Sequence, residues 1–135
     1  MKQSDKNIFE NTLLKITNRK SVIGIIGLGY VGLPLMLRFC SEKFKVIGFD
    51  IDEIKVKKLN NGESFINHIN DQQIIEAKNN KMIATTDFSF LSKVDVMIIC
   101  VPTPLNLHNE PDLSFIKSTL KKAIPYLKQN QLLIL

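Results

Sequence analysis

Two kinds of hydrophobic pattern alternate along this chain. Short runs that are apolar at nearly every position, such as Val22–Ile26, predict strands buried on both faces. Segments with apolar residues three or four positions apart, such as Asp112–Lys128, predict helices. Strands and helices that alternate in this way are typical of a parallel sheet covered by helices on both faces. The predicted strands are Val22–Ile26, Phe44–Phe49, Lys81–Thr85, Val94–Val101 and Leu132–Leu135, and the predicted helices are residues 5–18, Tyr30–Lys43, Asp52–Leu59, Asp71–Asn79 and Asp112–Lys128.

The order of these elements predicts an α/β fold of the Rossmann type, a doubly wound parallel sheet with strand order 3-2-1-4-5. Residues 1–20 precede it as a helical extension, and residues 21–135 form the sheet domain. The fifth predicted strand runs to the last residue with no turn or cap after it, so we expect the domain to be truncated after that strand. An apolar strand left at an open edge favours aggregation. The extension carries apolar residues at near-helical spacing, at Ile8, Phe9, Leu13 and Ile16.

The charge balance is moderately basic. The 18 basic and 13 acidic residues give a formal net charge of +5. The basic residues are mostly lysine and are scattered, without the arginine clusters or the interleaved aromatic residues that nucleic-acid binding requires. The sequence therefore predicts no nucleic-acid partner, although the surplus of positive charge favours an anionic ligand over a cationic one.

Neither the cysteines nor the apolar stretches indicate an extracellular or membrane protein. Cys40 and Cys100 are the only cysteines and lie in apolar surroundings, so they predict buried thiols in a reducing compartment, with no disulfide framework and no metal site. The longest charge-free stretch, Ser21–Leu37, divides into a strand, a turn and a helix start, and therefore predicts no membrane insertion. The N-terminus lacks the apolar core of a secretory signal, so we expect a cytoplasmic protein.

The sequence Gly27-Leu28-Gly29-Tyr30-Val31-Gly32, which we call the glycine turn, has the spacing G-x-G-x-x-G between a predicted strand and a predicted helix. This context is the one in which the spacing indicates dinucleotide binding. Gly27 permits the tight turn, Gly29 lets the backbone approach a diphosphate, and Gly32 allows the helix to pack closely on the sheet. The free N–H groups at the start of the helix, at the positive end of its dipole, supply a site for the anion. Tyr30 and Val31 of the turn are candidate cofactor contacts.

Asp50 lies at the end of the second predicted strand, 18 positions after Gly32. Its carboxylate can accept hydrogen bonds from the hydroxyls of an adenosine ribose. The same negative charge, with Asp52 nearby, repels a 2′-phosphate and therefore favours NAD over NADP as the cofactor. Lys55, one turn into the following helix, weakens that repulsion.

The fourth predicted strand ends in Val101-Pro102-Thr103-Pro104. In a sheet of order 3-2-1-4-5 its carboxyl end faces the same crevice as the glycine turn, so the Thr103 hydroxyl is a candidate cofactor contact, with a simple strand terminator as the alternative. His68 and His108 lie in predicted loops with no metal ligands at a suitable spacing, and we assign them no role.

Three segments together resemble the N-terminal domain of nucleotide-sugar 6-dehydrogenases, the UDP-glucose/GDP-mannose dehydrogenase family. These segments are Ile26–Leu35, Gly48–Asp52 and Val101–Asn106, and the resemblance extends from about residue 12 to the end of the chain. Within the family, Asn61–Ile69 and Pro104–Leu113 are most similar to UDP-N-acetylglucosamine 6-dehydrogenases, which make the uronic acid of surface polysaccharides such as O-antigen.

The resemblance implies NAD contacts from Val31, Asp50, Lys55 and Thr103. It also implies oxidation of a UDP-sugar C6 alcohol to a carboxylate with two NAD in succession, and a homodimer or a higher homo-oligomer. Family members are about three times as long as this chain, and their nucleophilic Cys, Lys and Asn lie beyond residue 135. No catalytic role therefore falls on Cys40 or Cys100, and we expect the chain alone to be inactive.

Other functions remain open at this level. The substrate of the complete enzyme is alternatively UDP-glucose, UDP-N-acetylmannosamine or UDP-N-acetylgalactosamine, because the sugar pocket is not in this sequence. The chain is alternatively a non-enzymatic NAD-binding remnant. A 6-phosphogluconate-type or hydroxyacyl-CoA dehydrogenase shares the glycine turn, but it does not readily account for Tyr30–Pro34 together with Pro102–Pro104.

Overall fold

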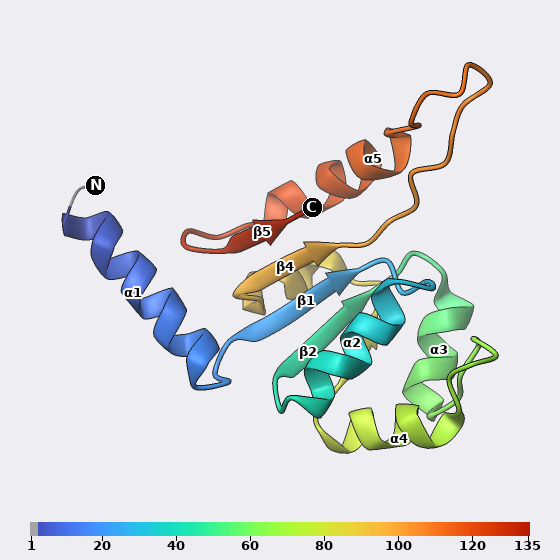
Figure 1. Ribbon diagram of the computed structural model, residues 1–135, viewed down its shortest axis with the longest axis horizontal. Coiled ribbons are helices and arrows are strands. Elements are labelled where there is room, and N and C mark those ends of the chain that lie inside the picture. The colour runs from blue at the N-terminus through green and yellow to red at the C-terminus, as the bar shows by residue number, and fades with distance from the viewer. Residues whose placement is uncertain (1–2) are drawn as a thin grey trace.

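The computed structural model describes residues 3–135, which form a five-stranded sheet with helices on both faces (Figure 1). All neighbouring strands are parallel, and their order is β3-β2-β1-β4-β5, as predicted. The strands are β1 (Val22–Ile26), β2 (Lys45–Phe49), β3 (Ile83–Thr85), β4 (Val96–Ile99) and β5 (Leu132–Ile134). The helices are α1 (Gln3–Thr17), α2 (Gly32–Ser41), α3 (Glu53–Asn61), α4 (Asp71–Asn79) and α5 (Ser114–Ala123), with short 3₁₀ helices η1 (Phe88–Lys93) and η2 (Ile124–Tyr126).

The central strand β1 separates two hydrophobic cores. Ile23 and Ile25 lie on one side, in a core that α2, α3 and α4 complete. Ile26 points to the other side, where side chains of η1 and α5 cover the sheet. Because both faces are covered, the central strands are apolar at almost every position, which explains why their sequences show no alternation of polar and apolar residues.

The fourth strand, β4, is shorter than predicted. The apolar run Val94–Val101 extends at both ends beyond Val96–Ile99, the residues that pair with neighbouring strands. The Val94 N–H bonds to the Leu91 carbonyl and closes η1, a helix that the sequence analysis missed. The Asp87 carboxylate begins η1 by accepting from the Ser89 N–H at 2.9 Å. At the other end, Pro102 has no N–H to donate to a ladder.

The helix predicted over Asp112–Lys128 is also interrupted. The α-helical part, α5, ends at Ala123, and the single turn η2 follows with Pro125 in its middle. Proline removes one helical hydrogen bond and clashes with the preceding turn, so the apolar periodicity of the segment overestimated the length of the helix. The helix predicted from Tyr30 begins at Gly32 instead, and Pro34 lies in its first turn as predicted.

The predicted N-terminal helix is present as α1, but most of its apolar side is not buried. Phe9, Leu13 and Leu14 are more than half exposed, whereas Ile16, near the C-terminal end of the helix, packs against the core. In Figure 1, α1 extends away from the sheet and approaches the domain mainly through that end. None of the helices that residues 3–135 form is both long enough and apolar enough to cross a membrane.

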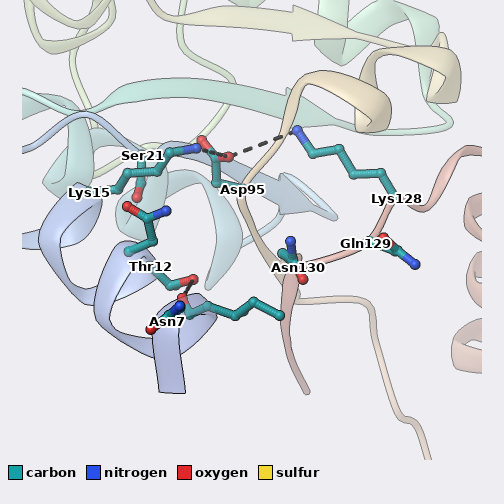
Figure 2. A pocket seen from close by; sticks show the side chains of 10 residues that line it. Asn7, Thr12, Lys15, Ser21, Asp95, Lys128, Gln129 and Asn130 are labelled. Atoms are coloured by element: carbon teal, nitrogen blue, oxygen red, sulfur yellow. Dashed lines mark hydrogen bonds and ion pairs between the residues drawn. The ribbon is translucent and has the colours of Figure 1, made fainter. Parts of the chain in front are cut away.

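Asp95 connects α1 to the amino-terminal edge of the sheet. One carboxylate oxygen accepts from the Val22 N–H at 2.9 Å, and the other lies 3.2 Å from the Lys15 ammonium and 3.9 Å from that of Lys128 (Figure 2). Partial burial opposes ionisation, but the hydrogen bond from Val22 and the two lysines outweigh it and hold the pKa of Asp95 below its ordinary value. The ionised carboxylate therefore stabilises the folded state.

The two edges of the sheet differ. At the β3 edge, the Asn60 side chain donates to the Ala84 carbonyl at 2.9 Å and accepts from the Ala84 N–H at 3.3 Å, so it pairs with the strand as another strand would. At the β5 edge, Leu132, Leu133 and Ile134 are each 42% exposed, and within residues 3–135 β4 is the only strand that pairs with β5.

Replacing Asp95 by Asn is expected to lower the free energy of unfolding by about 1 kcal/mol at neutral pH, because the lysines lose their partner while Val22 keeps an acceptor. Since the pKa of Asp95 is lower in the folded state, its contribution is complete above the ordinary Asp pKa of about 4 and is lost as pH falls through the folded value. Urea unfolding between about pH 5 and pH 2 measures the free energy of unfolding as a function of pH. This free energy should depend less steeply on pH in the Asp95→Asn variant than in the unsubstituted chain. Parallel pH profiles for the two chains would contradict this assignment.

Candidate functional site

The glycine turn lies where β1 ends, against the carboxyl end of β4. Gly27 has a φ of 93°, a conformation that favours glycine, and its N–H donates to the Phe49 carbonyl at 2.8 Å. A Cβ at Gly27 would lie 2.7 Å from the Cys100 carbonyl oxygen, too close for any side chain. The turn therefore connects the ends of β1, β2 and β4 in one place, as the predicted strand order requires.

Gly32 is needed for the close packing of α2 on the turn. A Cβ at this position would overlap the carbonyl oxygen of Gly27, which is backbone and cannot rotate away. The Leu33 N–H donates to the Gly29 carbonyl at 3.1 Å, so the helix starts directly from the turn. Both Gly27 and Gly32 are thus required by the fold itself.

Gly29 differs from the other two glycines of the turn. A Cβ at this position would meet no protein atom within 4 Å, and its φ is not in the left-handed region. The folded chain therefore gives no steric reason for glycine here. The space beside Gly29 is the kind of space that a ligand needs when it lies directly against the backbone.

The carboxylate of Asp50 is buried at 9% exposure and is held by the turn. One of its oxygens accepts from the Leu28 N–H at 2.8 Å, and the other accepts from the Asp52 N–H at 3.0 Å. A carboxylate has about four lone-pair sites, so acceptor capacity remains for a ribose hydroxyl. Sequence reasoning expected Asp50 to face the crevice but did not foresee that it also fixes the glycine turn.

The N-terminus of α2 has no side chain that caps it, since its N-cap residue is Val31. By contrast, the Asp52 carboxylate caps α3 by accepting from the Ile54 and Lys55 N–H groups, and Asn70 caps α4. Within residues 3–135, the N–H groups of Tyr30 and Val31 donate no hydrogen bond. These N–H groups, at the positive end of the helix dipole, are available to an anion.

The other predicted site residues lie around this turn to different degrees. The Tyr30 and Val31 side chains are largely exposed. Lys55 is half-buried on α3, and Thr103 is an exposed residue of the loop after β4, in which no described contact fixes its side chain. Ile51, which the sequence analysis passed over, is 69% exposed immediately after Asp50. The sequence signal that could have identified Ile51 as a candidate ligand contact is its position, since it is an apolar residue between Asp50 and Asp52 at the end of a strand.

Neither the cleft of Figure 2 nor the cysteines form part of this site. The cleft has a volume of about 360 Å³ and lies between α1 and the segment before β5, at the amino ends of the strands and not at their carboxyl ends. Cys40 is 1% exposed, and burial raises the pKa of its thiol to about 11; burial also raises the pKa of Cys100. Among residues 3–135, no group of three or more His, Cys, Asp or Glu side chains is arranged to hold a metal ion.

Comparisons with known proteins bear directly on this site. Residues 21–135 match the model of the UDP-glucose/GDP-mannose dehydrogenase family, NAD binding domain. The chain is 44% identical over 91 residues to protein CapL of Staphylococcus aureus, covering 67% of this chain and 20% of that protein. It is 32% identical over 112 residues to UDP-N-acetyl-D-glucosamine 6-dehydrogenase of Pseudomonas aeruginosa, covering 83% and 26%.

Solved structures give the same result. The UDP-D-ManNAc dehydrogenase of Pyrococcus horikoshii superposes with a TM-score of 0.76 at 32% sequence identity, covering 83% of this chain and 27% of that one. The chain therefore spans about a quarter of the length of these proteins. The match lies in the part of the chain that carries the glycine turn and Asp50.

Gly32 and Gly29 predict different effects of one added methyl group on the stability of the fold. Gly32→Ala should lower the free energy of unfolding by about 3 kcal/mol, because its Cβ overlaps backbone. Gly29→Ala should change it by less than about 0.5 kcal/mol, since its Cβ enters open space. Urea unfolding of the two variants side by side measures the difference, and equal losses of stability would show that Gly29 is also a packing glycine.

Burial predicts that Cys40 is chemically inert in the folded protein, since the thiolate is the reactive form. With iodoacetamide at neutral pH, Cys40 should remain unmodified while the chain is folded, and both cysteines should react once it is unfolded in guanidinium. Peptide mass spectrometry identifies the modified residue. Modification of Cys40 in the folded chain at the rate seen in the unfolded one would contradict its burial.

Proposed function

The chain belongs to the UDP-glucose/GDP-mannose dehydrogenase family as its NAD-binding domain, and from this we propose that it is the NAD-binding domain of a UDP-N-acetylglucosamine 6-dehydrogenase. The open space beside Gly29 is the observation that carries the assignment of the site, because the fold explains the glycines at 27 and 32 but not this one. A diphosphate against the backbone at this position accounts for it.

Each part of the site has a distinct task in this proposal. The free N–H groups at the start of α2, including those of Tyr30 and Val31, bind the diphosphate, and the Asp50 carboxylate binds the adenosine ribose. The exposed side chain of Ile51 packs against the adenine, and Thr103 approaches the cofactor from the loop after β4. When bound, NAD supplies the carbon that accepts a hydride from the substrate.

The site favours NAD over NADP on electrostatic grounds. Asp50 is fixed in place by two hydrogen bonds, so it cannot turn away from a 2′-phosphate. Asp52 adds a second negative charge nearby, although its oxygen is already engaged in capping α3. Lys55 on the same helix opposes this repulsion in part.

The substrate of the complete enzyme is proposed from sequence similarity. Asn61–Ile69 and Pro104–Leu113 favour UDP-N-acetylglucosamine, and the similar protein of Pseudomonas aeruginosa bears that name. The similar protein of Pyrococcus horikoshii is instead a UDP-D-ManNAc dehydrogenase, so UDP-N-acetylmannosamine is the second candidate. An enzyme that carries this domain together with a UDP-sugar domain, assayed with both substrates, distinguishes them.

The same proposal covers the setting of the enzyme. The complete enzyme would oxidise the C6 alcohol of the sugar to a carboxylate with two NAD in succession. It would act in the cytoplasm, as a homodimer or a higher homo-oligomer. The resemblance places the family's nucleophilic Cys, Lys and Asn outside these 135 residues, so we expect the residues by themselves to bind NAD without oxidising a UDP-sugar.

Calorimetric titration with NAD tests the site. Gly29→Ala should weaken NAD binding by roughly tenfold or more, because the methyl group occupies the space of the diphosphate. Asp50→Asn should weaken it by roughly tenfold through loss of a charged acceptor for the ribose, and should reduce the preference for NAD over NADP. Glu76→Gln on α4 is the matched control for one lost negative charge and should bind NAD normally. If Gly29→Ala and Asp50→Asn both bind NAD as the unsubstituted chain does, the site lies elsewhere.

A further inference from the structure

His68, a surface residue to which the sequence pattern assigned no role, lies beside the glycine turn. Its imidazole ring and the Tyr30 ring are stacked, with their centroids 6.4 Å apart and their planes at 23°. Both side chains are exposed, so the contact is not a by-product of core packing. Tyr30 immediately precedes Val31, whose N–H is one of the free donors at the start of α2.

A second contact connects the same loop to the site. The loop between α3 and α4 also carries Phe65, and the Lys55 ammonium lies 5.7 Å from the centre of the Phe65 ring. Two side chains of one loop therefore contact two residues, Tyr30 and Lys55, that the sequence analysis predicts to be part of the cofactor site. We call residues 64–69 the flanking loop.

The flanking loop is built to hold a fixed position. Ile66 and Ile69 are buried in the hydrophobic core on either side of the exposed residues 67 and 68. The Ser64 hydroxyl accepts from the Ile66 N–H at 3.1 Å, and the Ser64 N–H donates to the Asp71 carboxylate at 2.7 Å. The loop thus presents His68 toward Tyr30 from an anchored backbone.

We propose that the flanking loop forms part of the dinucleotide site, together with the glycine turn and Asp50, and that the His68 imidazole donates a hydrogen bond to a diphosphate oxygen of the cofactor. Imidazole has an N–H donor in its neutral form and two when protonated, so it serves a phosphate in either state. The stack places the ring against the side chain of Tyr30, a residue whose own N–H is one of the free donors at the start of α2, where the diphosphate would lie. This inference rests on the proposed function, since it assigns a residue to the same site.

Substitutions at His68 separate a hydrogen bond from a purely steric role. His68→Phe keeps a ring that can stack on Tyr30 but removes the donor, and it should weaken NAD binding by roughly tenfold in calorimetric titrations of the 135-residue chain. His108→Ala, which removes the other exposed histidine, is the matched control and should bind NAD normally. The loss should be equally large with ADP, which has the diphosphate, and absent with adenosine, which lacks it.

The possible outcomes are distinct. If His68→Phe binds NAD and ADP as the unsubstituted chain does, or if it loses affinity for adenosine to the same extent, the phosphate contact is wrong. If Gly29→Ala and Asp50→Asn weaken NAD binding while His68→Phe does not, the proposed function stands and this inference falls. If the unsubstituted chain binds no NAD, both are overturned.

Discussion

The glycine turn depends on close backbone contacts that only glycine permits, because a Cβ at Gly27 or Gly32 would clash with a backbone carbonyl group. The start of α2 touches the Gly27 carbonyl, and Gly27 in turn touches the Cys100 carbonyl at the end of β4. These two contacts bring three strand ends and one helix end to a single point. The Asp50 carboxylate then joins the turn to β2 through the Leu28 N–H. Without Gly27 and Gly32, neither the free N–H groups at the start of α2 nor the Asp50 carboxylate would have a fixed place.

Most of the fold was predictable because burial on both faces imposes a simple pattern. Runs such as Val22–Ile26 are apolar throughout only when helices cover both sides, and that observation led to the parallel sheet. The strand order followed from the alternation of strands and helices, which is typical of a Rossmann-type fold. The errors arose where local chemistry overrides periodicity. Pro125 ends α5 early, and the Asp87 carboxylate begins η1 in a segment for which no helix was predicted.

The candidate site was predictable in its components but not in its internal connections. The spacing of the glycines and the place of Asp50 follow from residue types at fixed offsets. That the Asp50 carboxylate accepts a hydrogen bond from the Leu28 N–H of the glycine turn depends on how distant segments pack, and so does the contact of the His68 loop with Tyr30. A periodicity argument has no access to such contacts, because it considers neighbours along the chain and not neighbours in space.

The two edges of the sheet differ in whether they can accept a further strand. The amide of Asn60 occupies the outer backbone groups of Ala84, so an incoming strand would have to displace it. The far side of β5 offers its N–H and carbonyl groups together with apolar side chains on both faces. Any polypeptide that enlarges the sheet, from whatever source, would therefore join next to β5 and leave the β3 side unchanged.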